Sequence, residues 1–208
     1  VEPAMPTAVE EVLAAYLART AVFISADPAR PTQTGALTGV MASAVGKRFI
    51  LTERQTLLEN GIATLTTVSG TVQIERAVTT YQRNAMGDAD ASYLDSETLH
   101  TSAYILRRLK SIITSKYARH KLADDGTRYG AGQAIVTPSV IKGELVAEYA
   151  RLELKGICEN RDLFKAHLIV ERNADNPNRL DVLFPPDYVN QLRIFALLNQ
   201  FRLQYSEE

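Results

Sequence analysis

Apolar residues recur at spacings of three and four between Asp95 and Arg119, and this periodicity predicts a long amphipathic helix. Asp95 stands where an N-cap residue belongs. The predicted buried face consists of Leu99, Ala103, Leu106, Leu109, Ile113 and Tyr117. A second helix is predicted from Pro138 to just before Gly156, because proline at the first helical position loses no intrahelical hydrogen bond and glycine is typical of the C-terminal cap. Its apolar stripe consists of Ile141, Leu145, Tyr149 and Leu152.

The start of the chain carries shorter signals. Thr7 and Glu10 have the spacing of a capping box, which predicts a helix that continues to about Arg19. The apolar run Ala21–Ala26 is typical of a buried strand.

Residues 27–51 contain several prolines and glycines, and this composition predicts an irregular loop. A second capping box at Thr52–Gln55 follows. With Gly61 at the position of a C-terminal cap, it predicts one further short helix.

Two segments of the chain have the composition of a β-hairpin. Ile62–Val68 and Thr71–Thr80 are rich in Val, Ile and Thr, and they meet at Ser69–Gly70. That dipeptide supplies the positive φ that a tight hairpin turn requires. The predicted inward face of the second strand consists of Val72, Ile74 and Arg76.

A second antiparallel pair is predicted nearer the C-terminus. His167–Arg172 and Arg179–Phe184 alternate around the turn-forming residues 173–178, and Pro185–Pro186 ends the second strand. The periodicity of Val189–Tyr205 fits a helix and a strand about equally well.

These elements place the chain in the α/β (α+β) class. Its 208 residues are 46% hydrophobic and 23% charged, which is ordinary for a soluble protein of one or two domains. The net charge of −1 gives no general attraction to nucleic acid or to an anionic membrane, and no apolar run has the length of a transmembrane helix. The single cysteine, Cys158, excludes an intramolecular disulfide framework and is interpreted as a small buried hydrophobe near a helix end.

The charge is nevertheless unevenly distributed. Basic residues are concentrated between Ile105 and Gly130, at Arg107, Arg108, Lys110, Lys116, Arg119, Lys121 and Arg128. One interpretation is that positive charge near a helix C-terminus complements the helix dipole. The other is that Arg107, Arg108, Lys110 and Lys116 face an acidic surface on another protein, in which case the contact should weaken with salt.

The run His120–Gln133, HKLADDGTRYGAGQ, predicts a rigid corner between the two long helices. Asp124, Asp125 and Gly126 form a turn signal, and Gly130 and Gly132 permit backbone angles that are closed to other residues. We expect Asp124 or Asp125 to accept hydrogen bonds from Arg128 or from nearby backbone N–H groups and so to fix the flanking helices. The predicted corner residues are Asp124, Asp125, Arg128, Gly130 and Gly132. The alternative is an acid–base cluster, but an Asp-Asp-Gly turn with an arginine on a carboxylate is much commoner.

Other catalytic and metal-binding motifs are incomplete. Gly130-Ala131-Gly132 lacks the further residues of a dinucleotide or phosphate loop. Asp88–Ser92 begins like a calcium loop, but Tyr93 stands in place of its glycine and Leu99 in place of its glutamate. The three histidines lie in separate elements, without partners at metal-ligand spacing. The sequence therefore predicts no metal, no cofactor and no catalytic residue.

Several long segments resemble one known family. HKLADDGTRYGAGQ, together with NGIATLTTVSGTVQIERAVTTYQ (Asn60–Gln82) and LIVERNADNPNRLDVLFPPDYVNQLRIFALLNQFRL (Leu168–Leu203), is similar to the contractile-tail sheath protein of Mu-like bacteriophages. DPARP (Asp27–Pro31) lies in register with these segments. The resemblance extends from about Asp27 to Leu203 and covers the C-terminal portion of a longer protein. Since the chain also begins at Val1 rather than Met, we expect it to be a fragment.

The resemblance implies a mixed, largely antiparallel sheet flanked by helices. It further implies that residues 1–60 are the end of the preceding sheath core domain and that residues 61–208 form the tail sheath C-terminal domain. In that family the terminal arms add strands to neighbouring subunits, so Val189–Tyr205 is predicted to be a long strand. The residues expected at that contact between subunits are Leu192, Ile194, Phe195, Leu197, Phe201 and Leu203.

The function implied by the resemblance is structural. Such subunits form stacked hexameric rings around a tail tube protein, bound by baseplate and tail terminator proteins, and contraction drives the tube through the host envelope. The expected location is the virion, after assembly in the bacterial cytoplasm, with no nucleic acid or membrane partner. A tailocin or secretion-type injection machine is an alternative. A phosphoester hydrolase that uses Asp124, Asp125 and Arg128 is a further one.

Overall fold

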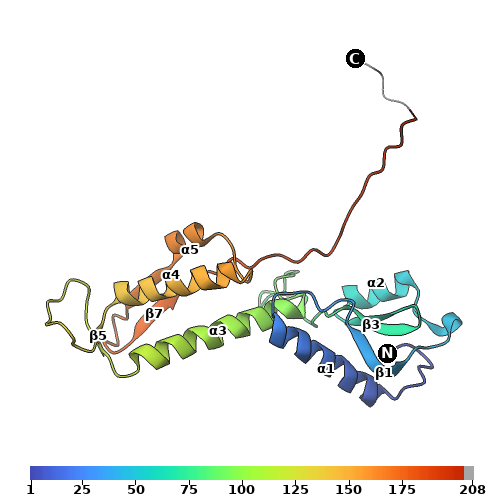
Figure 1. The fold of residues 1–208 in the computed structure, drawn as a ribbon, viewed down its shortest axis with the longest axis horizontal. Helices are drawn as coiled ribbons and strands as arrows, with labels where there is room; N and C mark the ends of the chain where they lie inside the picture. The colour runs from blue at the N-terminus through green and yellow to red at the C-terminus, as the bar shows by residue number, and fades with distance from the viewer. Residues whose placement is uncertain (204–208) are drawn as a thin grey trace.

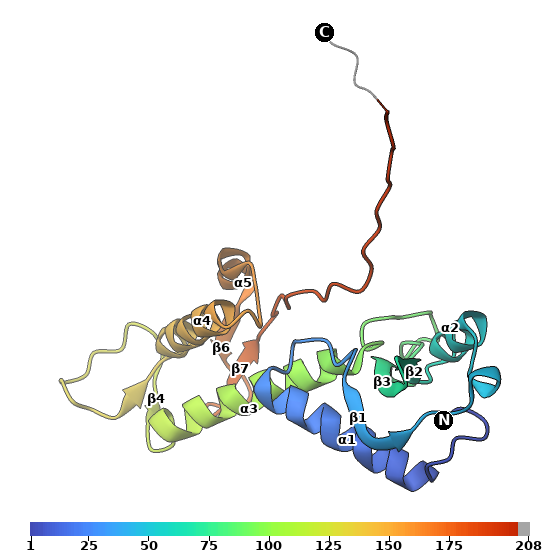
Figure 2. The ribbon, with the colours of Figure 1, turned by 45° about the vertical axis from the view of Figure 1, so that its right-hand side comes forward.

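The computed structural model describes residues 1–203 of the chain. The body is elongated and consists of two lobes placed end to end, and the C-terminal segment leaves the body between them (Figures 1 and 2). The sheet lobe comprises residues 1–95, the helical lobe residues 96–188 and the terminal arm residues 189–203. None of the helices in this described part is both long and apolar enough to cross a membrane.

The sheet lobe is a small antiparallel sheet with helices packed against its edge strands. Its elements are α1 (Val9–Ala26), β1 (Ala36–Met41), the 3-10 helix η1 (Val45–Lys47), α2 (Leu51–Glu59), β2 (Thr64–Val68) and β3 (Thr71–Arg76). β3 lies between β1 and β2 and pairs antiparallel with both. α1 packs against β1, and α2 packs against β2. The buried core consists of Val12, Leu37, Val72, Ile74 and Ala77.

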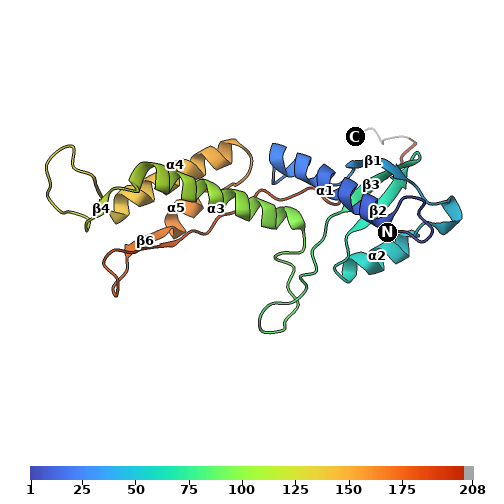
Figure 3. The same ribbon diagram turned by 90° about the horizontal axis from the view of Figure 1, so that it is seen from below.

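The helical lobe is built on two long helices that run side by side (Figures 1 and 3). Its elements are α3 (Ser96–Tyr117), β4 (Lys121–Leu122), β5 (Ile135–Val136), α4 (Pro138–Leu154), α5 (Arg161–His167), β6 (Ile169–Arg172) and β7 (Leu180–Leu183). β4 and β5 pair in parallel, whereas β6 and β7 form a separate antiparallel pair. The Tyr149 ring stacks on Phe164 with 3.8 Å between ring centroids. Around this stack lie Ile105, Leu145, Leu152 and Leu168.

Much of the predicted fold is confirmed. The mixed α/β architecture with antiparallel sheets is present. The predicted hairpin is also present, and its turn lies at Ser69 and Gly70, whose φ values are 50° and 82°. Pro138 begins α4, and Gly156 follows its end with a positive φ. The stripe Ile141, Leu145, Tyr149 and Leu152 is buried, as is Cys158.

The prediction of a strand at Ala21–Ala26 was wrong, because these residues complete α1. The ring of Phe23 lies against Gly35, where an added Cβ would come within 2.7 Å of it. Tertiary packing of this kind can override the strand propensity of a short apolar run. The predicted capping box was also wrong, since Thr7 Oγ1 instead accepts a hydrogen bond from the backbone N–H of Met41 at 2.8 Å.

Residues 27–51 are not wholly irregular, because they contain β1 and η1. Alternation of apolar residues is weak in β1, whose strand character comes from pairing with β3. The second cap lies earlier than predicted: the Glu53 carboxylate accepts a hydrogen bond from the N–H of Ile50 at 2.8 Å, and α2 begins at Leu51. The helix α5 was not predicted from the sequence.

The buried face of α3 is rotated relative to the predicted one. Leu99 and Leu106 are exposed, whereas Glu97, Thr101 and Ile105 are buried. The Thr101 hydroxyl donates a hydrogen bond to the carbonyl of Pro28 at 3.0 Å, so part of the inward face is polar. Apolar periodicity alone could not locate such a face.

The long strand predicted at Val189–Tyr205 is absent from the described part of the chain. Residues 189–203 are extended and pair with no strand of residues 1–203. Gln204 and Tyr205 lie outside the described residues. An extended segment becomes a strand only when another strand supplies its hydrogen bonds.

Candidate functional site

The terminal arm presents apolar side chains to solvent. Leu192, Ile194, Phe195, Leu197, Leu198, Phe201 and Leu203 are each between 74% and 92% exposed. Figures 1 and 2 show the arm leading away from both lobes. Exposed apolar side chains on an extended backbone with unpaired N–H and C=O groups are characteristic of a segment that pairs with another chain.

The helical lobe also exposes incomplete β-structure. β6 and β7 form an isolated pair, so within residues 1–203 each has one edge without a strand partner. Ile169, Val182 and Leu183 on this pair are between 44% and 59% exposed. Because a two-stranded sheet is marginally stable alone, a further strand would stabilise this one.

The segment before the arm is firmly attached to the helical lobe. The Tyr149 hydroxyl donates a hydrogen bond to the carbonyl of Glu159 at 2.6 Å and accepts one from the N–H of Asp187 at 3.1 Å. The hydroxyls of Tyr188 and Ser102 lie 2.8 Å apart and share a hydrogen bond. Burial raises the pKa of Tyr149 to about 12, so its phenol stays protonated near neutral pH.

The first residues of the arm remain attached to the body. Gln191 Nε2 donates a hydrogen bond to the carbonyl of Ala29 at 3.0 Å. The Arg193 guanidinium donates to Gln33 Oε1 at 3.0 Å, to Asp95 Oδ1 at 3.1 Å and to Glu97 Oε2 at 3.2 Å. Arg193 is therefore held by the body and largely covered, while the adjacent Leu192 and Ile194 are exposed.

The basic residues of α3 divide into two kinds. Arg108 pairs with the buried carboxylate of Glu148, and Lys116 pairs with Glu144 at 2.6 Å. Arg107 and Lys110 are exposed and form no ion pair within residues 1–203. Of the four predicted contact residues, Arg107 and Lys110 are thus exposed without an ion-pair partner there, whereas Lys116 is exposed but paired.

The predicted corner is an exposed loop that is held at its base. The Asp124 carboxylate accepts two hydrogen bonds from Arg172, each of 3.1 Å. Asp125 accepts hydrogen bonds from the N–H and the hydroxyl of Ser139, at 3.1 and 2.6 Å, and these bonds lower the pKa of Asp125. The structure thus connects Asp125 to the first turn of α4.

Two other corner residues do not take the expected roles. Arg128 makes no hydrogen bond or ion pair within residues 1–203, so it does not clamp either aspartate there. Gly132 has a φ of 78°, whereas Gly130 does not have a positive φ. Sequence reasoning missed Arg172, which is 48 positions from Asp124, and Ser139, which is 14 positions from Asp125.

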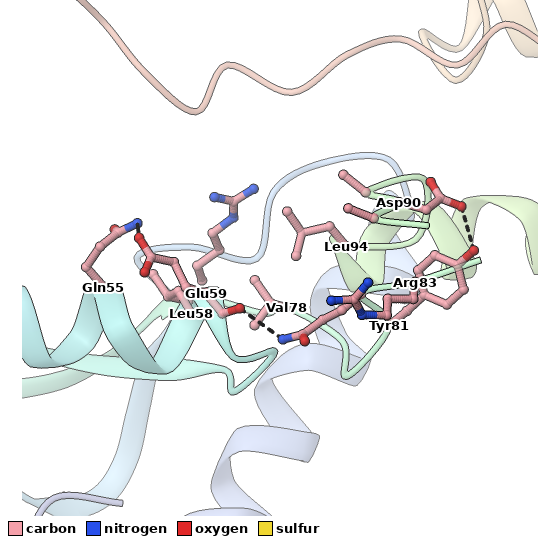
Figure 4. Close-up of a pocket in the computed structure, with 12 residues that line it drawn as sticks. Gln55, Leu58, Glu59, Val78, Tyr81, Arg83, Asp90 and Leu94 are labelled. Carbon is pink, nitrogen blue, oxygen red and sulfur yellow. Dashed lines mark hydrogen bonds between the residues drawn. The ribbon is translucent and has the colours of Figure 1, made fainter. Parts of the chain in front are cut away.

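The sheet lobe contains a surface pocket of about 490 Å³. Figure 4 shows that Leu58, Val78 and Leu94 line it together with polar side chains. The Tyr81 hydroxyl donates a hydrogen bond to Asp90, and Gln82 Nε2 donates to the carbonyl of Glu59. These polar groups are occupied in fixing the long loop after β3. Across residues 1–203, no group of three or more His, Cys, Asp or Glu residues is arranged to hold a metal ion.

The chain thus exposes an open two-stranded sheet and an apolar extended arm, and both features are typical of proteins that pair with another chain. The sequence profile of the phage tail sheath C-terminal domain matches residues 88–202, and that of the phage tail sheath protein central domain matches residues 5–80. The chain is 46% identical over 190 residues to the Mu-like prophage FluMu tail sheath protein of Haemophilus influenzae. This protein belongs to the phage tail sheath protein family.

The match covers 91% of this chain and 39% of the Haemophilus influenzae protein, so the chain spans about two fifths of that relative. Solved structures share the fold at low sequence identity. A sheath tail protein of Desulfitobacterium hafniense is 9% identical, with a TM-score of 0.53 over 79% of this chain and 35% of that one. A chain of the six-fold symmetrised anti-feeding prophage baseplate is 10% identical, with a TM-score of 0.62 over 89% and 48%.

Proposed function

We propose that this chain is the C-terminal part of a structural subunit of a phage contractile tail sheath. The subunit polymerises around the tail tube, and contraction of the sheath drives the tube through the host envelope. The observation that carries the proposal is the terminal arm, whose apolar side chains from Leu192 to Phe201 are exposed and which pairs with no strand within residues 1–203. Pairing with a sheet edge of a neighbouring subunit would satisfy both.

The recipient in this proposal is the β6–β7 pair of the neighbouring subunit. Main-chain hydrogen bonds tolerate a change of side-chain contacts, so linked arms hold subunits together while the sheath changes length. Repeated head-to-tail contacts that do not close on themselves generate a helical array. Stacked hexameric rings are the arrangement we propose for the full-length protein.

The further partners are the tail tube, the baseplate and the tail terminator protein. Arg107 and Lys110 are exposed on α3, and we assign them to an acidic surface of the tube or of a neighbouring subunit. The location proposed is the virion, after assembly in the host cytoplasm. No nucleic acid or membrane is included in this assembly. The division of the chain at residue 60 stays a prediction.

No enzymatic role is proposed. In the hydrolase alternative Asp124, Asp125 and Arg128 form one cluster, but Asp124 binds Arg172 and Asp125 binds Ser139. The tailocin and secretion-type alternatives share the same subunit chemistry. Genes adjacent to the coding sequence discriminate them, because a phage tail requires a head and its DNA-packaging proteins.

The test uses the full-length protein and negative-stain electron microscopy. Phe195→Asp combined with Phe201→Asp places charges on the arm and should abolish long sheaths while the subunit stays folded, as judged by circular dichroism. The matched control is Met86→Asp combined with Leu154→Asp, at positions that are 90% and 89% exposed and lie outside the arm. Sheaths of normal length from the arm variant would show that the arm does not link subunits.

A further inference from the structure

A charge-balanced junction lies where the two lobes meet the root of the arm. Two carboxylates, Asp95 and Glu97, stand at the start of α3. Arg76 at the end of β3 binds Asp95 with two hydrogen bonds, of 2.9 and 3.0 Å. Arg193 of the arm binds both carboxylates from the other side. The junction therefore joins the sheet lobe, the helical lobe and the arm through four charged side chains.

Glu97 is the fixed centre of this junction. Its side chain is fully buried, and Oε1 accepts hydrogen bonds from both the N–H and the hydroxyl of Thr32, each at 2.8 Å. Oε2 faces Arg193 at 3.2 Å. A carboxylate taken out of water is costly unless it is paired and hydrogen-bonded. Arg193 supplies the positive charge at Oε2, the carboxylate oxygen that does not bind Thr32.

The burial of Arg193 contrasts with that of its neighbours. Its side chain is 13% exposed, whereas Leu192 is 74% and Ile194 is 83% exposed. An extended arm whose only function was to offer a strand would gain nothing from burying one arginine. The guanidinium group is instead inserted into the body, and its planar fork fixes orientation as well as position.

We propose that Arg193 is a clamp that sets the direction in which the arm leaves the body. This inference rests on the proposed function of the arm and names the residue that positions it. Because Tyr188 before the arm bonds to Ser102 of the helical lobe, whereas Arg193 binds Gln33 of the sheet lobe, the clamp holds only while the two lobes keep their relative position. The arm direction and the angle between the lobes are thereby coupled, so a change in one is transmitted to the other.

The rate of tryptic cleavage after Arg193 measures how often this residue leaves the clamp. Trypsin cleaves after an arginine only where that residue is detached from the body and can enter the active site of the protease. Glu97→Gln keeps the shape of the buried side chain and an acceptor for Thr32, but it removes one of the two carboxylate charges that hold Arg193. We expect cleavage after Arg193 in the full-length protein to accelerate by roughly tenfold, as expected for the loss of a hydrogen bond between charged groups. Cleavage after Arg202, beyond the clamp, is the internal reference and should not change.

The matched control is Glu144→Gln, which removes a carboxylate from the Lys116 pair elsewhere on α3. It should leave the ratio of the two cleavage rates unchanged. A ratio that is equally unchanged in Glu97→Gln would overturn the clamp. A rise of similar size in both variants would also overturn it, since the effect would then be general destabilisation of α3.

Sheath assembly then tests the consequence of the clamp. Arg193→Gln should shorten sheaths several-fold, and Arg193→Lys, which keeps the charge but lacks the fork, should restore part of the length. Equal sheath lengths in the wild type and in Arg193→Gln would refute a positioning role. Failure of the proposed function would give a different result. In that case the arm variant with Phe195→Asp and Phe201→Asp would still form sheaths, while cleavage after Arg193 would still accelerate in Glu97→Gln.

Discussion

The Tyr149 hydroxyl is predicted to stabilise the helical lobe by connecting α4 to the segment before the arm. Replacing Tyr149 with Phe keeps the ring and its stack on Phe164, at 3.8 Å between centroids, so no cavity forms. The change removes the donor to the Glu159 carbonyl and the acceptor for the Asp187 N–H. Both backbone groups then lose a partner beside a side chain that is fully buried.

The magnitude follows from these two hydrogen bonds. At about 0.5–1.5 kcal/mol for each bond, the free energy of unfolding should fall by roughly 1–3 kcal/mol. A chain of this size loses about 2–4 °C in Tm for each kcal/mol, so a decrease of roughly 4–8 °C is expected near the middle of that range. Thermal unfolding followed by circular dichroism, with urea unfolding as a second measurement, determines both quantities.

Tyr104→Phe is the matched control. The Tyr104 hydroxyl accepts a long hydrogen bond, of 3.4 Å, from Lys155, and its removal should lower Tm less than removal of the Tyr149 hydroxyl. If Tyr149→Phe unfolds at the wild-type temperature, the two hydrogen bonds contribute no net stability and the attachment of Asp187 has another cause. A decrease as large in Tyr104→Phe would mean that any lost hydroxyl in this lobe has the same effect.

Three further predictions concern other parts of the chain. Burial raises the pKa of the Cys158 thiol from 9.0 to about 12. Because the thiol of the unfolded chain ionises at lower pH, the contribution of the protonated, buried thiol to the free energy of unfolding is intact below pH 9 and is lost as pH rises towards 12. Urea titrations across that range should show a shallower loss of stability for Cys158→Ala. Gly35→Ala should lower Tm, because the new Cβ would lie 2.7 Å from the Phe23 ring, whereas Gly46→Ala, with open space around it, should not. Arg107→Glu combined with Lys110→Glu should weaken binding of sheath to tube in a co-sedimentation assay at low salt and have a smaller effect at high salt. If neither the substitutions nor the salt concentration changes binding, these two residues do not contact the tube.

Local sequence signals determined the elements whose boundaries depend on backbone chemistry. Ser69–Gly70 adopts the positive φ values of a tight turn, and few other residue pairs do so without strain. Pro138 and Gly156 mark the start and the end of α4 for similarly local reasons. The stripe that faces the core between them was predictable because α4 buries the apolar side that its period defines.

Tertiary contacts decided what local signals could not. Ala21–Ala26 is helical although its composition is typical of a strand, and Phe23 of this helix packs against Gly35. The inward face of α3 includes Glu97 and Thr101, whose partners come from the loop before β1 and which no apolar period reveals. Asp124 is bound by Arg172 and not by the nearby Arg128.

The arm shows the difference between these two kinds of information most directly. Its apolar residues were recognisable from the sequence, and so was the ambiguity of their periodicity. Its extended conformation without a partner strand depends on the rest of the structure, because a strand requires hydrogen bonds from a second chain segment. Arg193 could not be singled out from the sequence, since it meets Gln33 across 160 positions of the chain. Residue type gives the charge of such a side chain, and only the folded chain brings its partners within hydrogen-bonding distance.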